Sequence, residues 1–274
     1  MANSNLQQRI VSGIIGAAVI ISGILFSDWS YMLINIGIAL LGLNEFYQLC
    51  QKAGHKVSYW LGMGLALALN LATYFVLKEE IHPLTFSVGF PLVLVIFVVT
   101  LFDKTEKSPM MTIGLTFLGI VYVVLPFCLA HGIVIHAARS VLMGIILLVW
   151  GNDIGAYFAG KHLGKHKLFE RISPKKTWEG FIGGAFLVFV ATFFMHHFIG
   201  VLTLADWIIM GLIISPVATF GDLVESMIKR SLNIKDSGGI MPGHGGMLDR
   251  IDSLLFVFPV ATTFILLWLS LHWI

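Results

Sequence analysis

The sequence predicts an all-α, polytopic integral membrane protein with about nine transmembrane helices. Of its 274 residues, 57% are hydrophobic and only 12% are charged, and the mean hydropathy is +0.90. Several apolar runs reach roughly 18 residues or more, the length that an α-helix needs to cross a bilayer. This composition excludes an ordinary soluble domain. The net charge of +2 gives no reason to expect a nucleic-acid partner.

The expected membrane spans are apolar runs separated by polar residues. In order, they cover residues 10–26, 29–49, 57–77, 84–102, 109–130, 140–158, 181–200, 205–228 and 252–273. The first two are separated by a very short polar turn and are expected to form a helical hairpin. The first run has no small-residue cleavage site followed by a soluble domain, so we expect a retained helix and not a signal peptide.

The positive charges predict how the spans are oriented. Every lysine and arginine except Lys78 and Arg139 lies in the N-terminal segment or in loops on its side of the membrane. Cytoplasmic loops carry an excess of lysine and arginine. The N-terminus and the two long polar loops, residues 159–180 and 229–250, are therefore expected in the cytoplasm, and the C-terminus on the other side.

The most polar stretch is residues 222–252, DLVESMIKRSLNIKDSGGIMPGHGGMLDRID. Four of its side chains recur at positions i, i+3, i+4 and i+7 and would share one face of a helix: Asp222, Glu225, Ser226 and Lys229. Asp249 and Asp252 repeat the i, i+3 spacing at the start of the last apolar run. Acids this close to apolar spans are rare without a function, so both groups are candidate site residues.

The residues between these acids are mostly cations and glycines. They are Lys229, Arg230, Lys235, Asp236, His244 and Arg250, with Gly238, Gly239, Gly243, Gly245 and Gly246. Glycine reaches positive φ easily and lets backbone N–H groups approach an anion. Magnesium is usually held by one or two carboxylates together with phosphates. The stretch therefore predicts a site for a divalent metal and phosphate groups, and the alternative is a solvated loop that joins two helices.

A second polar region, residues 151–180, starts inside an apolar run and becomes strongly basic. Asp153 lies near the end of a span, where an acid needs a partner or a wet cavity, so it is a candidate site residue. The alternative is that Asp153 packs between helices and pairs with a nearby lysine. Lys175, Lys176 and Thr177 precede the next expected helix, whose N-terminus is a natural phosphate site. The alternative, that these lysines bind anionic lipid headgroups, stays open from the residues alone.

Other polar or sulfur-containing side chains carry weaker signals. Cys50 and Cys128 lie in or beside apolar runs without metal-ligand spacing. We expect both cysteines to be reduced and to serve in packing, and a disulfide between them is the alternative. His162 and His166 are four residues apart without a third ligand, so they are expected to be solvated. Glu45 is an acid within a span, and both lining a site and local pairing stay open for it.

The polar stretch at 222–252 resembles the phosphatidate cytidylyltransferase family, also called CDP-diacylglycerol synthases. The family pattern is met by Ser226, Lys229, Arg230, Lys235, Asp236, Gly238, Pro242, Gly243, His244, Gly245, Gly246, Asp249, Arg250 and Asp252. The family also carries a block similar to SPKKTWEG, residues 173–180, ahead of this motif. The length and hydropathy of the whole chain are similar to the family as well.

The resemblance implies that CTP and phosphatidate react to give CDP-diacylglycerol and pyrophosphate for phospholipid biosynthesis. The lipid phosphate would attack the α-phosphorus of CTP in line, so the enzyme would supply position and charge neutralisation without a nucleophile of its own. The resemblance also implies Mg²⁺, with room for a second, monovalent cation such as K⁺, a homodimer, and a place in the cell (inner) membrane. We expect one membrane-embedded catalytic domain over 1–274, with N-terminal helices in about 1–138 and the catalytic part in about 139–274.

The same resemblance implies roles for individual residues. The expected principal metal ligands are Asp222 and Asp249, with Asp252 and Glu225 as their supports or as ligands of a second metal. The expected catalytic residues are Asp222, Asp249, Lys229 and Arg230. The expected substrate contacts are Ser226, Lys175, Lys176, Thr177, Lys235, Asp236, His244, Gly245, Gly246, Arg250 and Asp153. Asp236 could hold Lys235 or touch the cytidine, and the sequence does not separate these roles.

Two other functions compete with this one. A secondary transporter also has intramembrane acids, glycine-interrupted helices and basic loops. Against it, no internal repeat is apparent, and the charges cluster at one membrane face instead of at the midplane. The other is a CTP-dependent enzyme acting on an isoprenoid lipid, and the close match of the long motif argues against it. The sequence does not determine the acyl-chain preference or the preference for CTP over dCTP.

Overall fold

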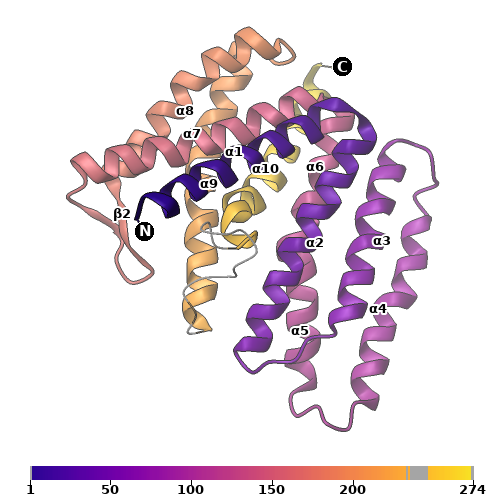
Figure 1. Ribbon diagram of the computed structural model, residues 1–274. Helices are drawn as coiled ribbons and strands as arrows, with labels where there is room; N and C mark the ends of the chain where they lie inside the picture. Colours follow the sequence, from indigo (N-terminus) through magenta and orange to yellow (C-terminus); the bar gives the residue numbers. More distant parts are fainter. Residues whose placement is uncertain (1, 233, 235–245, 273–274) are drawn as a thin grey trace. The chain divides into compact units, whose positions relative to one another are not determined.

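The computed structural model describes residues 2–232, 234 and 246–272, with side chains from residue 13 onward except those of residues 88 and 272. Nearly all of this part of the chain is helical (Figure 1). The residues group into two compact units. The first unit comprises Met1–His131 and Ser231–Ile251, and the second comprises Gly132–Arg230 and Asp252–Ile274.

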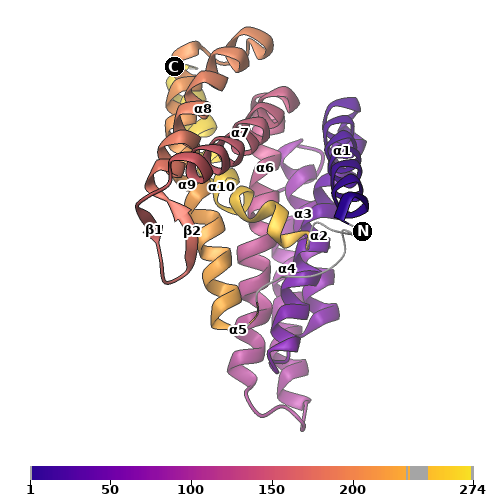
Figure 2. The same cartoon turned by 60° about the vertical axis from the view of Figure 1, so that its left-hand side comes forward.

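The helices of the first unit are α1 (Ala2–Phe26), α2 (Asp28–Lys52), α3 (Tyr59–Leu77), α4 (Thr85–Phe102), α5 (Pro109–Gly119), the π-helix η1 (Ile120–Val124) and α6 (Leu125–His136), which ends in the second unit. Of these, α2, α3, α4 and the continuous run of α5, η1 and α6 lie side by side in Figures 1 and 2. The expected hairpin of the first two spans is present because Ser27 and Ser30 form a capping box that starts α2. Each serine hydroxyl accepts a hydrogen bond from the other's backbone N–H, which satisfies donors that the helix end leaves unpaired.

The second unit contains two packed helices, a short β-hairpin and two further long helices. The elements are α7 (Arg139–Leu163), β1 (Lys167–Phe169), β2 (Ser173–Thr177), α8 (Trp178–Ile199), α9 (Leu204–Ser231) and α10 (Leu248–His272). Strands β1 and β2 pair in antiparallel fashion between α7 and α8, as Figure 2 shows. Helix α10 begins in the first unit and continues into the second.

Within the described part of the chain, eight helices are long and apolar enough to cross a membrane. A shorter apolar helix, Gly13–Phe26, lies in the first expected span. The run expected at 109–130 continues through η1 to His136. The prediction of an all-α polytopic membrane protein is therefore confirmed. The β-hairpin lies in the expected polar loop at 159–180, where strands this short and exposed leave no clear apolar alternation to read.

Glycines allow α7 and α8 to approach each other closely. A side chain at Gly155 would meet the carbonyl oxygen of Gly183 at 2.7 Å, and one at Gly184 would meet Asn152 Oδ1 at the same distance. A side chain at Gly183 would overlap the Cβ of Ala159. Small residues permit such close packing of helices in lipid. The contact places the polar end of α7 directly against the start of α8.

A closed ring of hydrogen bonds joins α2, α3 and α6 in the core of the first unit. The Tyr31 hydroxyl donates to His131 Nδ1 at 2.8 Å, and His131 Nε2 donates to Asn70 Oδ1 at 2.9 Å. Asn70 Nδ2 donates to Asn35 Oδ1 at 3.1 Å, and Asn35 Nδ2 donates back to the Tyr31 hydroxyl at 3.4 Å. All four side chains are buried. Because polar groups inside a membrane must be satisfied by the protein, the ring is a structural tie between the three helices.

Candidate active site

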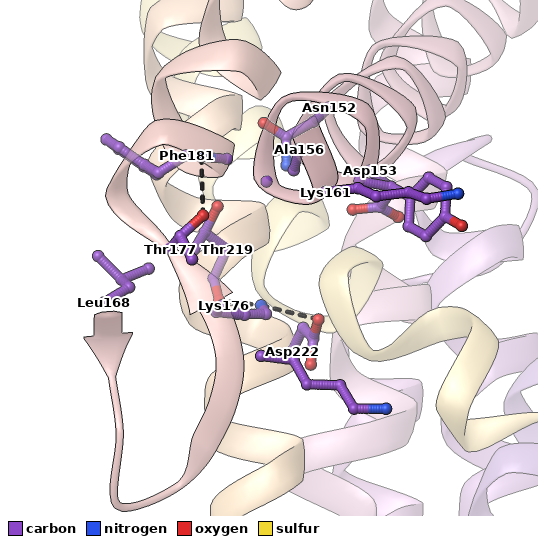
Figure 3. A pocket seen from close by; sticks show the side chains of 14 residues that line it. Asn152, Asp153, Ala156, Lys161, Leu168, Lys176, Thr177, Phe181, Thr219 and Asp222 are labelled. Carbon is purple, nitrogen blue, oxygen red and sulfur yellow. Dashed lines mark hydrogen bonds and ion pairs between the residues drawn. The ribbon is translucent and has the colours of Figure 1, made fainter. Parts of the chain in front are cut away.

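A cavity of about 380 Å³ lies in the second unit, between α7, the β-hairpin, α8 and α9 (Figure 3). It is lined by Asn152, Asp153, Ala156, Tyr157, Gly160 and Lys161 of α7, Leu168 of β1, Lys175, Lys176 and Thr177 of β2, Gly180 and Phe181 of α8, and Thr219 and Asp222 of α9. Five residues that the sequence singled out, Asp153, Lys175, Lys176, Thr177 and Asp222, therefore line one cavity.

Lys176 joins the β-hairpin to α9. Its Nζ lies 2.7 Å from Asp222 Oδ2 and also donates to the carbonyl oxygen of Thr219 at 3.3 Å. Figure 3 shows this pair at the cavity wall. Both side chains are partly exposed, so a bound anion or cation can reach them from the cavity. Lys176 is therefore placed to contact a ligand inside the cavity. This position suits such a ligand better than it suits a lipid headgroup.

Thr177 starts helix α8 at the cavity wall. Its backbone is extended, with φ −129° and ψ 155°, and its hydroxyl accepts a hydrogen bond from the backbone N–H of Gly180 at 3.1 Å. Threonine is a good N-cap because its oxygen satisfies one of the unpaired N–H groups of the first turn. The helix dipole adds partial positive charge at this end. With Lys175 and Lys176 in the same strand, the start of α8 favours a phosphate group.

Glu179 holds the connection between α7 and the β-hairpin in place. Its carboxylate accepts hydrogen bonds from the backbone N–H groups of Lys165, at 3.0 Å, and His166, at 3.2 Å. The His166 imidazole Nδ1 lies 2.6 Å from the same carboxylate. His166 is thus solvated, as expected, but it is also tied to α8. The hairpin wall of the cavity is fixed to α8 by this contact.

Asp252 of α10 lies near acids of α9 and α7 in the second unit. Asp252 interacts electrostatically with Asp222, Glu225 and Asp153. The two helices meet closely here, since a side chain at Gly221 would meet the Asp252 carbonyl oxygen at 2.7 Å. The Ser253 hydroxyl also donates to the carbonyl oxygen of Ala218 at 3.1 Å, beside the crossing.

The expected polar face of α9 exists. Ser226 Oγ donates to Asp222 Oδ1 at 3.3 Å, one turn away. Lys229 Nζ lies 2.7 Å from Glu225 Oε2, and Glu225 is buried. These i, i+4 contacts are those that the spacing predicts for a helix. Arg230, at the end of α9, is exposed and does not line the cavity.

The start of α10 in the first unit is held by Glu45 of α2. Glu45 is fully buried, and its Oε2 accepts a hydrogen bond from the backbone N–H of Leu248 at 2.7 Å. Asp249 Oδ2 accepts from the backbone N–H of Gly246 at 3.2 Å, and Arg250 is exposed. Glu45 therefore caps the start of α10 from a distant part of the chain, which is neither of the two roles that the sequence left open. Asp249 lies in the same helix as Asp252, three residues earlier.

Some expected site residues lie outside the described residues: Lys235, Asp236, His244 and Gly245. Conversely, the cavity includes side chains that the sequence reading missed, among them Tyr157, Lys161 and Thr219. Tyr157 and Lys161 follow Asp153 at i+4 and i+8, so a helix extended to residue 161 would have put all three on one face. No comparable pattern in the sequence points to Thr219.

The acids suit a magnesium ion that arrives with phosphate groups. Among the described residues, no group of three or more His, Cys, Asp or Glu side chains could hold a metal ion alone. Magnesium, however, is usually bound by one or two carboxylates plus the phosphates of a substrate. Asp222, at the cavity, and Asp252, near it, offer such oxygens. The donor set fits this kind of site.

Together, the helices and the cavity define a multi-pass membrane protein with a cavity that is lined by three lysines and bordered by acids. The chain belongs to the cytidylyltransferase family, whose sequence model matches residues 7–268, and it is accordingly a nucleotidyltransferase enzyme. A phosphatidate cytidylyltransferase of Haemophilus influenzae is 34% identical over 94% of this chain and 98% of its own length. One of Bacillus subtilis is 30% identical over 93% and 96%. One of Staphylococcus aureus is 52% identical over 42% of this chain and 44% of its own length.

Proposed function

We propose that this enzyme transfers the cytidylyl group of CTP to phosphatidate, giving CDP-diacylglycerol and pyrophosphate. The observation that carries the proposal is the cavity in which Lys176 pairs with Asp222 beside the start of α8. It combines a lysine and the positive end of the α8 dipole for phosphate with acids for a metal, inside a chain of the cytidylyltransferase family. The two relatives that match over nearly their whole length are named for this reaction.

The chemistry requires position and charge neutralisation. An oxygen of the phosphatidate phosphate forms a bond to the α-phosphorus of CTP while the bond from that phosphorus to the bridging oxygen of pyrophosphate breaks. The attacking oxygen is already anionic, so the protein need not supply a nucleophile. Two anionic substrates must instead be held close together and in line, which cations and fixed dipoles make possible.

Each part of the cavity has a distinct task in this reaction. Lys175, Lys176 and the N-terminus of α8 bind phosphate oxygens, and Lys161, which lies 5.8 Å above the Tyr157 ring, adds a further cation. Asp222 and Asp252 would hold Mg²⁺. The bound ion would neutralise charge on the triphosphate.

Several predictions from the sequence remain part of this proposal. Asp249 is the other principal metal ligand besides Asp222, Asp252 and Glu225 are supports or ligands of a second metal, and Lys229 and Arg230 meet phosphate oxygens. Lys229 already has Glu225 as a partner in α9, which would orient its ammonium group. The cell membrane, the cytoplasmic position of the polar loops and the homodimer also belong to the proposal. The distribution of lysine and arginine supports the orientation.

The test is pyrophosphate release by the purified protein in detergent with CTP and phosphatidate, with and without Mg²⁺. CDP-diacylglycerol is identified in parallel by mass spectrometry, and ATP, GTP and UTP replace CTP as controls. We expect release that requires CTP, lipid and Mg²⁺ together. A folded protein that releases no pyrophosphate would contradict the proposal and favour a transporter, which substrate flux in proteoliposomes would then examine.

A further inference from the structure

A second, smaller hollow continues from the polar cavity along α8 and α9. Its volume is about 230 Å³, and it is lined by residues of these two helices alone. Phe181 lines both this groove and the polar cavity. The two hollows are therefore neighbours that share one wall residue, with Phe181 at their junction.

The groove runs from the cavity toward the middle of both helices. On α8 its lining extends from Phe181 to Phe189, which is about 12 Å of helix at 1.5 Å per residue. On α9 it extends from Pro216 back to Ile208, while Thr219 and Asp222, further along the same helix, line the polar cavity. Since α8 and α9 are both candidate membrane spans, this direction leads from the polar end of the span into the hydrocarbon.

The wall of the groove is chemically apolar. Ser215 contributes a polar side chain, but its hydroxyl donates to Asn152 Oδ1 at 2.8 Å, and both residues are buried. That hydrogen bond links the groove wall to Asn152, which lines the polar cavity. The other lining side chains are aromatic, aliphatic or absent. Such a surface suits hydrocarbon and does not suit a nucleotide.

The groove has a closed floor and an open rim. Its floor includes Gly211, where a side chain would meet Thr192 Cγ2 of α8 at 2.7 Å, so the two helices touch there. Its rim includes Phe189 and Leu212, which are 41% and 63% exposed. A hydrocarbon chain can therefore enter sideways from the bilayer without a change in the helix packing.

We propose that this groove between α8 and α9 binds the first part of one acyl chain of phosphatidate while its phosphate lies in the polar cavity. The proposal rests on the proposed function and specifies how that site takes its lipid. Phosphatidate carries a phosphate at one end and hydrocarbon at the other, so its site must pass from cationic to apolar along one direction. The cavity and the groove do this across Phe181. The second acyl chain stays in the bilayer.

The first experiment fills the groove. Ala185 lines it, so Ala185→Phe adds a ring there, whereas Ile182→Phe adds a similar ring on the same helix at a site that is 63% exposed and outside the groove. The readout is kcat/KM with dioleoyl and with dihexanoyl phosphatidate at saturating CTP. We expect Ala185→Phe to lower the ratio of long-chain to short-chain kcat/KM about tenfold or more, as a clash in an apolar pocket does. Ile182→Phe should leave the ratio unchanged.

The second experiment uses the wild-type protein. Phosphatidate with a diazirine in one acyl chain is photolysed on the protein without CTP, and the labelled peptides are identified by mass spectrometry. We expect labelling on the facing sides of α8 and α9 that excess unlabelled phosphatidate suppresses and phosphatidylcholine does not. Labelling spread over all lipid-exposed helices, or suppressed equally by both lipids, would show surrounding membrane lipid only and overturn the proposal.

The outcomes separate the two proposals. An active wild-type enzyme whose Ala185→Phe variant keeps the wild-type chain-length ratio contradicts the acyl-chain groove and leaves the proposed function intact. If Ala185→Phe does not fold, the labelling pattern of the wild-type protein decides. A wild-type protein that forms no CDP-diacylglycerol contradicts the proposed function and this inference with it.

Discussion

Two of the polar side-chain clusters in the described part of the chain differ in their charge and in whether their hydrogen bonds form a closed ring. In the first unit, Tyr31, Asn35, Asn70 and His131 form a closed ring whose members satisfy one another. In the second unit, Lys176 and Asp222 face a cavity and stay partly exposed.

The ring lies in helices long enough to span a membrane, and Asp222 lies in another such helix, whereas Lys176 comes from strand β2. The difference shows how polar side chains with a structural role can be told apart from polar side chains with a functional role in a membrane protein. A closed ring of hydrogen bonds adds stability and specificity to helix packing. Charged groups at a cavity are costly to maintain, so they indicate a site for a ligand.

The largest expected effect is on turnover, from a change in the charged cluster. Asp222→Asn removes a carboxylate at the cavity and the partner of Lys176. We expect kcat to fall about a hundredfold or more, as loss of one transition-state contact does, with little change in Tm.

The matched control is Asp206→Asn at the other end of α9, where the carboxylate accepts hydrogen bonds from Thr203 and Trp268. This control should lower Tm and leave turnover per folded molecule unchanged. Equal turnover in wild type and Asp222→Asn would remove Asp222 from the site.

The second prediction changes the closed ring. Asn70→Leu leaves the His131 Nε2 donor and the Asn35 Oδ1 acceptor without their partner. We expect a loss of about 1 to 3 kcal/mol in the free energy of unfolding, the cost of leaving a buried polar group unsatisfied, while kcat per folded molecule is kept. Thermal unfolding in detergent and turnover at low temperature measure the two quantities. If kcat fell with unchanged stability, the ring would have a functional role and the comparison would fail.

Glu45 is an acid that is fully buried and accepts a hydrogen bond from the backbone N–H of Leu248. Glu45→Ala removes the acceptor for the Leu248 N–H and should cost about 1 to 2 kcal/mol, as loss of a helix N-cap does. Glu45→Gln keeps a side-chain oxygen that can accept this bond and should retain both stability and activity to within a few-fold. A Glu45→Gln enzyme as inactive as Asp222→Asn would instead place Glu45 in the reaction.

The smallest effect is expected in a polar loop of the first unit. Hydrogen bonds from Thr105 and then the Lys56 ammonium lower the pKa of Asp103 from 3.8 to about 2. A lowered pKa stabilises the fold above the unfolded value and loses this contribution as the pH falls toward about 2. The Tm difference between wild type and Asp103→Asn should therefore be small and constant at neutral pH and should shrink between about pH 4 and 2. A difference that grows on acidification would contradict the assignment.

The sequence was informative where the deciding interactions are local. Apolar runs predicted the helices because crossing a bilayer requires about 20 apolar residues. The i, i+3, i+4 pattern predicted the polar face of α9, where Ser226 meets Asp222 and Lys229 meets Glu225. It could not predict the β-hairpin, whose exposed residues lack an apolar pattern. The role of Glu45 was also out of reach, because its partner lies 203 residues away.

The class of protein, the membrane-spanning helices and the residue types available for phosphate and metal could all be predicted from the amino-acid sequence. Those properties depend on composition and on neighbours within one or two helical turns. The contact of Lys176 with Asp222, 46 positions apart in the sequence, and the apolar groove that shares Phe181 with their cavity depend on long-range packing. The reason is packing: glycines at the contact of α7 and α8 and the crossing of α9 and α10 set which side chains can touch, and such contacts are not encoded in local periodicity.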